Sequence, residues 1–214
     1  GSSSTTTIPT TARPAAKSAE RDTWQLPDTI FSVMSGVRGQ TVADLFADDG
    51  YMSFKLIDAG ANVIAMETDQ AKVDKLNERK RELGLGDDRL RVRKVEAGDP
   101  GLAPEEADVA LLMHHFTKQP AVMRYIDRVR QGLKAPKRVV IVDFLPRPSP
   151  MGPPVHERLT ETQVMDSMDV LMIGDVGAYT MKLPYQYIVI AQDRTLSDEE
   201  LQMMDKGGLP VDHR

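Results

Sequence analysis

The sequence predicts an α/β fold whose doubly wound, mostly parallel seven-stranded sheet ends in a C-terminal antiparallel hairpin. Five alternations of strand and helix patterns indicate a parallel sheet with helices on both faces. Two of the strand patterns are continuous apolar runs, at 109–113 and 139–142, as in strands buried on both faces. The last two strand patterns are separated by a short turn at Pro184, too short for a helical crossover, so they must pair antiparallel.

The elements expected in the first half each have a local signal. They are a helix at 27–34, a strand at 41–46, a helix at 51–59, a strand at 62–66, a helix ending at 83 and a strand at 90–95. Pro27 suits the first turn of a helix. Gly60 ends the second helix, and Thr68 or Asp69 caps the third.

The second half continues the alternation and then changes. The expected elements are a strand at 108–113, a helix at 120–133, a strand at 138–144, a helix at 160–172, strands at 176–183 and 186–192, and a helix at 197–206. The segment 146–154 is rich in proline and is expected to be an ordered loop. It would either cover a pocket or act as a stiff connector.

Composition excludes several functions. The net charge of −5 argues against a protein that grips nucleic-acid phosphates, because such binding needs a basic face. The absence of cysteine excludes disulfides, thiolate metal sites and cysteine nucleophiles. No apolar run reaches the length of a membrane span. We therefore expect neither nucleic-acid binding nor a membrane span, and a homodimer is left open.

The chain is expected to hold one domain between two tails. Residues 1–20 are rich in Ser, Thr, Pro and Ala and are expected to be a disordered linker. Residues 21–194 form the domain, and residues 195–214 form a C-terminal helix and tail. Gly1 is typical of a tag scar, and a linker of this kind would follow a removed export signal. The compartment is unknown, with an exported or periplasmic location favoured.

The segment Val42–Tyr51 has the pattern of a strand, a tight turn and a helix start, as in nucleotide-binding folds. Glycine suits such a turn because it tolerates positive φ and lets a ligand approach the backbone. Phe46 and Asp48 occupy two of the three usual glycine positions, and only Gly50 remains. Asp48 could repel an anionic ligand. Alternatively, it and Asp49 could cap the following helix, where negative charge is favoured.

Several segments, in order and spacing, resemble the class I S-adenosylmethionine-dependent methyltransferases, which have a Rossmann-like fold. The similarity covers roughly residues 22–193, and its glycine-rich first motif is degenerate. The segments that carry it are Val42-Ala43-Asp44-Leu45 with Gly50-Tyr51, Val63–Glu67, Asp108–Met113 with His114-His115-Phe116, Arg138–Phe144, Leu183–Tyr187 and Trp24-Gln25-x-Pro27.

The resemblance implies S-adenosylmethionine as the cofactor and a small molecule as the methyl acceptor. It places Asp44, Ala47 and Gly50 beside the methionine part of the cofactor, Glu67 at the ribose hydroxyls, and Glu96 or Asp99 near the adenine. No catalytic or metal-binding residue is assigned.

A non-catalytic relative that keeps the fold as a binding or interaction module is the alternative, favoured by Phe46 and Asp48. The closing hairpin argues against a nucleotide-dependent oxidoreductase. His114 and His115 would point to opposite faces of a strand, so they are not expected to chelate one ion. Either could still line a substrate pocket.

Overall fold

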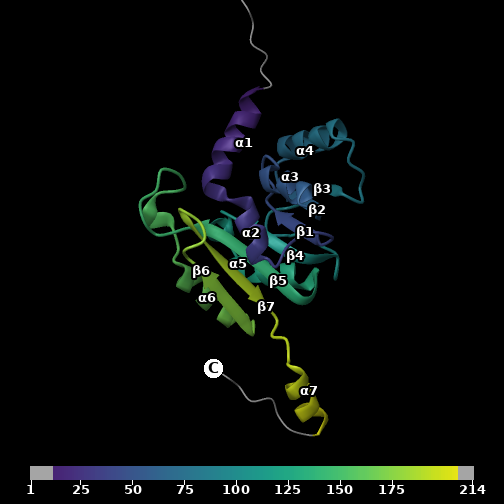
Figure 1. The fold of residues 1–214 in the computed structure, drawn as a ribbon, viewed down its shortest axis with the longest axis vertical. Coiled ribbons are helices and arrows are strands. Elements are labelled where there is room, and N and C mark those ends of the chain that lie inside the picture. The colour runs from purple at the N-terminus through teal and green to yellow at the C-terminus, as the bar shows by residue number, and fades with distance from the viewer. Residues whose placement is uncertain (1–11, 207–214) are drawn as a thin grey trace, which may run out of the picture.

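A mixed sheet of seven strands lies at the centre of the structure, a computed structural model that describes residues 12–206. The strands are β1 (Thr41–Leu45), β2 (Asn62–Glu67), β3 (Leu90–Lys94), β4 (Ala107–Met113), β5 (Leu133–Phe144), β6 (Asp175–Tyr179) and β7 (Gln186–Gln192). Their order is β3-β2-β1-β4-β5-β7-β6 (Figure 1). The first five are parallel, and β7 pairs antiparallel with both β5 and β6. The predicted fold class is confirmed.

Helices cover both faces of this sheet. They are α1 (Ala12–Gln25), α2 (Pro27–Val33), α3 (Tyr51–Asp58), α4 (Gln70–Glu82), α5 (Val122–Gln131), α6 (Glu161–Val170) and α7 (Asp198–Asp205), with 3₁₀ turns η1 (Phe116–Lys118) and η2 (Val155–Glu157). Successive strand residues point to opposite faces. Val42 thus packs in the core that includes residues of α2, α3 and α4, whereas Ala43 packs in the core that includes residues of α5 and α6.

The main correction concerns the N-terminal segment. Disorder through residue 20 is wrong for residues 12–20, because α1 begins at Ala12. Alanine and long charged side chains favour the helix, and its end is held by tertiary contacts. The ring of Trp24 lies 6.2 Å from that of Phe144, and the Gln25 side chain donates a hydrogen bond to Gln186. The expectations for residues 1–11 and 207–214 lie outside the described residues.

Two strand boundaries also differ from expectation. β5 begins at Leu133 rather than at residue 138, because its first residue already pairs with Ala107 of β4. β6 ends at Tyr179 rather than at residue 183. Bends occupy the residues up to Pro184, whose ring nitrogen cannot donate a hydrogen bond to a neighbouring strand.

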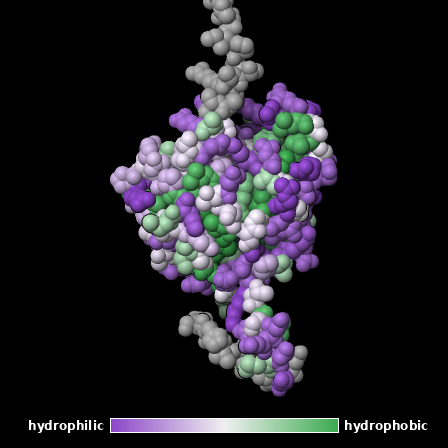
Figure 2. Space-filling model, in the orientation of Figure 1, coloured by the Kyte–Doolittle hydropathy of each residue, from purple (hydrophilic) through white to green (hydrophobic). Residues whose placement is uncertain are grey.

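The surface is mostly polar, and α7 lies apart from the sheet. Figure 2 shows hydrophilic residues over most of one face, with hydrophobic residues gathered near its middle. In the same orientation, α7 follows β7 and stands away from the body (Figure 1). Within residues 12–206, no helix is both long enough and apolar enough to cross a membrane.

The strand order places the site. The chain runs outward in one direction from β1 to β2 and β3, and in the other from β4 to β5. At such a switch point the loops after the two central strands separate and leave a crevice at their carboxyl ends, where α/β proteins bind ligands. Here that crevice lies between the loop after β1 and the loop after β4.

Candidate functional site

A cavity of about 140 Å³ lies at the carboxyl ends of β1 and β4. Its walls come from the loop after β1, the start of α3, the loop after β4 and one residue of α1. The lining residues are Arg21, Asp44, Phe46, Ala47, Asp48, Asp49, Tyr51, Met52, Met113, His114, His115 and Lys118. Sites for drug-sized ligands occupy about 300–1,000 Å³, so the cavity suits a small ligand or one end of a larger one.

The loop after β1 keeps the backbone conformation that glycines usually provide. Phe46, Asp48 and Gly50 all have positive φ, at 59°, 54° and 80°. The left-handed region costs a non-glycine residue roughly 1–2 kcal/mol, so Phe46 and Asp48 are both strained. At Gly50 a Cβ atom would meet the Phe54 and Leu76 side chains at 2.6 Å, so this position also needs glycine for space.

Hydrogen bonds from the end of β2 hold this loop. The Ala47 N–H donates to the Met66 carbonyl over 2.8 Å. The Asp48 N–H donates to Oε2 of Glu67 over 2.9 Å. Within the loop, the Gly50 N–H donates to the Ala47 carbonyl. These bonds offset the strain and fix the loop in the shape of the glycine turn.

Glu67 is occupied by backbone groups. It is 3% exposed. Its Oε1 accepts hydrogen bonds from the N–H groups of Thr68 and Asp69 over 2.8 and 3.1 Å, in addition to the bond from Asp48 at Oε2. A carboxylate offers about four acceptor positions. Three of them therefore serve backbone groups, one in the loop after β1 and two directly after β2, and Glu67 is not among the residues that line the cavity.

Asp44 is a buried acid on the cavity wall. Its Oδ2 accepts a hydrogen bond from the Ser53 hydroxyl over 2.6 Å. Burial raises the pKa of Asp44 to about 6, while the Ser53 bond and the charge of Arg21 act in the opposite direction. A buried carboxylate of this kind would gain from a cationic ligand group.

Asp48 and Asp49 have different roles. Oδ1 of Asp49 accepts a hydrogen bond from the Tyr51 N–H over 3.0 Å, so Asp49 caps the start of α3 as expected. The capping role is wrong for Asp48, whose carboxylate pairs with Lys72 of α4 at 2.6 Å. Burial raises the pKa of Asp48, but the hydrogen bond and charge of Lys72 bring it below the ordinary value. Lys72 thus offsets the repulsion expected toward an anionic ligand.

Two neutral imidazoles form the wall that follows β4. Burial lowers the pKa of His114 to about 3 and that of His115 to about 4. Nε2 of His114 is hydrogen-bonded to the side-chain amide of Gln186. The His115 ring instead stacks on Phe46. Among residues 12–206, no group of three or more His, Asp or Glu is arranged to hold a metal ion.

Comparison with known proteins shows similarity in structure. No protein-family model matches the chain, and no curated protein matches its sequence. A SAM-dependent methyltransferase from Aquifex aeolicus has a TM-score of 0.75 at 19% identity, over 88% of this chain and 100% of its own. The cyclase SpnF has a TM-score of 0.66 at 14% identity, over 80% and 82%. The pyocyanin biosynthetic protein PhzM has a TM-score of 0.62 at 16% identity, over 79% of this chain and 55% of its own.

The chain has the fold of the class I S-adenosylmethionine-dependent methyltransferases.

The structure brings together only some of the residues assigned from the sequence. Asp44 and Ala47 line the cavity, and Gly50 is the N-cap of α3 beside it. Glu67 contacts the loop after β1 but does not line the cavity. The side chain of Glu96 is 89% exposed and lies 3.9 Å from that of Lys94, outside the cavity lining.

Arg21 of α1 is a lining residue that sequence reasoning missed, as it did Lys118, Met52 and Met113. Its guanidinium lies 3.9 Å above the Tyr51 ring and 3.7 Å from Oδ1 of Asp49. The spacing of Arg21, Trp24 and Gln25 places the three on one side of a helix. This was the available signal, and the expected disorder of the preceding residues obscured it.

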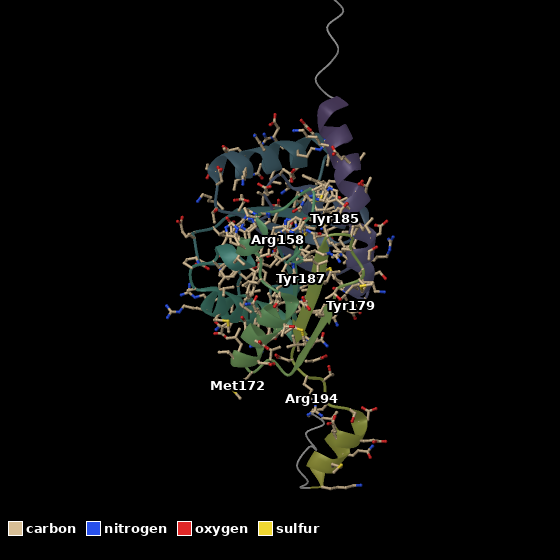
Figure 3. The ribbon with its side chains drawn as sticks, turned by 90° about the vertical axis from the view of Figure 1, so that its left-hand side faces the viewer. Arg158, Met172, Tyr179, Tyr185, Tyr187 and Arg194 are labelled. Atoms are coloured by element: carbon tan, nitrogen blue, oxygen red, sulfur yellow. The ribbon has the colours of Figure 1, made fainter. Side chains whose placement is uncertain are left out.

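The proline-rich loop is a connector. The guanidinium of Arg158 donates to the carbonyls of Leu145, Arg147 and Pro153 and to the Ser149 hydroxyl. Arg158, labelled in Figure 3, is half-buried. No residue of this loop lines the cavity, so the structure favours a stiff connector over a cover.

Proposed function

We propose that the protein binds S-adenosylmethionine at the cavity between β1 and β4 and transfers its methyl group to a small molecule. The observation that carries the proposal is the positive φ of Phe46, Asp48 and Gly50. Backbone of this shape lets a ligand approach the loop, and residues held in strained torsion angles cluster at binding sites, so these angles support the proposal. The methyltransferase from Aquifex aeolicus and the biosynthetic protein PhzM support the reaction class and a small acceptor.

The residues around the cavity fit one end of this cofactor. The methionine part carries an ammonium and a carboxylate, and the walls offer the buried acid Asp44 and the cation Arg21. The cavity volume of about 140 Å³ suits that part alone. The adenosine would then extend along the ends of β2 and β3, toward Glu67 and Glu96.

When bound, the cofactor supplies an electrophilic methyl group. The chain's own contribution is to hold the acceptor in line with that group, which is an effect of orientation. The uncharged part of the lining includes His114, His115, Met52 and Met113, which would exclude water from the reacting groups without adding charge.

A specific observation favours the alternative, a non-catalytic binding or interaction protein. The Phe46 side chain stacks on His115 where a glycine would leave the loop open. In addition, three backbone N–H groups already occupy the carboxylate of Glu67 that would hold a ribose. A protein that has stopped using the nucleoside half of its site would retain the fold with these two features.

Calorimetric titration with S-adenosylmethionine and S-adenosylhomocysteine up to millimolar concentration separates the two functions. We expect weak binding by the natural chain and at least about tenfold tighter binding by Phe46→Gly combined with Asp48→Gly, because the loop is opened and a carboxylate is removed. Asp87→Gly is the matched control, since Asp87 is another exposed acid paired with a lysine. Absence of heat with both ligands for both proteins would exclude the methyltransferase function.

A homodimer and the absence of nucleic-acid binding stay predictions. β6 is an edge strand, and an unprotected edge can pair with a second copy. Tyr179 at the end of that strand and Met172, which precedes the strand in the chain, are both labelled in Figure 3 and are exposed. Light scattering would determine the mass in solution. Export also stays a prediction, which cell fractionation would test.

A further inference from the structure

Helix α1 presents one cation to the cavity. Arg21 is the lining residue that comes from this helix, and the others come from β1, β4, α3, the turn η1 and the loops after β1 and β4. Its charge acts on two groups of the site. It opposes the burial that raises the pKa of Asp44, and it adds to the burial that lowers the pKa of His114. The helix therefore influences the cavity although it lies outside the sheet and its loops (Figure 1).

The position of Arg21 is fixed by its neighbours. Oδ1 of Asp22 accepts a hydrogen bond from the Tyr51 hydroxyl over 2.5 Å, and its Oδ2 accepts one from Nζ of Lys55 over 2.6 Å. Both donors belong to α3. One turn further, the Gln25 side chain donates to Gln186 over 2.6 Å. These contacts dock the end of α1 and hold Arg21 over the cavity.

The guanidinium has spare hydrogen-bonding capacity. Its carbon lies 3.9 Å from the centre of the Tyr51 ring, and the Asp49 carboxylate is 3.7 Å away, beyond hydrogen-bond distance. Its Nε is buried and has no hydrogen-bond partner among the described residues. Buried donors are rarely left unpaired, and such a group calls for an explanation. A planar guanidinium is matched in shape to a carboxylate, which it can bind through two parallel hydrogen bonds.

The charges around the cavity select the kind of anion. The charged lining residues are the cations Arg21 and Lys118 and the acids Asp44, Asp48 and Asp49, so a phosphate would face three carboxylates. A zwitterion is better suited, since its ammonium can approach the buried Asp44 while its carboxylate meets Arg21. The ligand group is therefore the α-amino-acid end of a small molecule.

We propose that Arg21 of α1 is the receptor for the α-carboxylate of the ligand, so that this helix is a part of the binding site. The inference rests on the proposed function, because the methionine part of the cofactor is such an α-amino acid. It deepens that function by assigning the recognition of one ligand group to a residue outside the glycine loop.

The test compares three probes by calorimetry: S-adenosylmethionine, its decarboxylated form and L-methionine. The protein variants are Arg21→Gln, Arg21→Lys and the matched control Arg79→Gln, which removes an exposed arginine paired with Glu82 on α4. We expect Arg21→Gln to weaken binding of S-adenosylmethionine and L-methionine about tenfold or more. It should leave the decarboxylated form within about twofold, because that form lacks the group that Arg21 binds. The affinity of Arg21→Lys for S-adenosylmethionine should lie between those of the natural chain and Arg21→Gln. The control Arg79→Gln should leave the affinities for all three probes unchanged.

Each other outcome is decisive. Unchanged binding of S-adenosylmethionine by Arg21→Gln overturns the proposal, and so does an equal loss for the decarboxylated form, since a structural role would weaken both. If the natural chain binds L-methionine but not S-adenosylmethionine, the proposed function fails, and the L-methionine comparison alone decides the role of Arg21. If it binds none of the three probes, both proposals fall. Thermal unfolding monitored by circular dichroism checks that every variant is folded.

Discussion

The ring of Phe46 lies on the imidazole of His115, with ring centroids 4.4 Å apart and planes inclined by 8°. The contact joins the loop after β1 to the loop after β4, and the ring of Tyr125 packs beside it at 5.8 Å. A side chain thus stands where the usual glycine turn would leave open backbone. It stabilises the loop pair and narrows the site at the same time.

Because Phe46 has positive φ, a glycine at this position should destabilise the protein less than an alanine, the reverse of the order found within a helix. Phe46→Gly should be more stable than Phe46→Ala by about 1 kcal/mol, since only glycine is unstrained at that φ. Phe54 within α3 is the control, where alanine should be favoured over glycine by about 1 kcal/mol. Urea unfolding of the four variants gives the differences. Equal ranking at both positions would show that the loop relaxes when the ring is removed.

Glu67→Gln should destabilise the protein by about 1–3 kcal/mol. An amide directs two hydrogens toward backbone N–H groups that now donate to a carboxylate, so at least one of those donors loses its acceptor. Glu96→Gln, at an exposed carboxylate, should change the free energy of unfolding by less than about 0.5 kcal/mol. Chemical denaturation measures both. A neutral result for Glu67 would mean that its carboxylate is available to a ligand.

His114 should make the fold sensitive to acid. Its pKa is about 3 in the folded state and 6.5 when it is free, because burial disfavours the charged ring. Its contribution to stability is therefore complete above pH 6.5 and is lost as the pH falls toward 3. Between pH 7 and pH 4.5 the loss should approach about 3 kcal/mol. His114→Asn retains a residue that tolerates positive φ. In unfolding curves measured at a series of pH values, this variant should lose less stability than the natural chain between pH 7 and pH 4.5.

Asp44 should make the fold less stable as the pH rises, whereas His114 makes it less stable as the pH falls. Its folded pKa of about 6 lies above the ordinary value of 3.8. Its contribution is therefore most favourable below pH 3.8 and is lost as the pH rises through 6. Relative to the natural chain, Asp44→Asn should gain up to about 3 kcal/mol between pH 3.5 and pH 7.5. A difference between the two proteins that does not vary with pH would show that Asp44 titrates normally.

The parts of the fold that follow from periodicity were predictable from the sequence. The buried runs of β4 and β5 and the short link before Gln186 carry the strand order and the closing hairpin, because burial on both faces and chain length leave little choice. The places of Asp44 and Gly50 followed from the same pattern. Helix α1 was not predictable from the sequence pattern, since it is held by contacts with residues far along the chain, such as Gln186.

The chemistry of the site was less predictable for a related reason. Glu67 occupies the expected position at the end of β2, yet backbone N–H groups bind its carboxylate, and backbone donors leave no trace in residue types. For Asp48 the sequence left a helix cap and repulsion of an anionic ligand open, whereas its carboxylate pairs with Lys72 of α4. A residue type predicts which bonds are available, whereas tertiary packing decides which of them form.

The hydrogen bonds between the loop after β1 and the end of β2 have a consequence for how such loops are recognised. The Met66 carbonyl and the Glu67 carboxylate accept hydrogen bonds from the N–H groups of Ala47 and Asp48, so they hold the loop whatever the side chains at positions 46 and 48 are. The turn therefore keeps its backbone shape with two residues larger than glycine. A search for further proteins with this turn should compare backbone torsion angles as well as residue types.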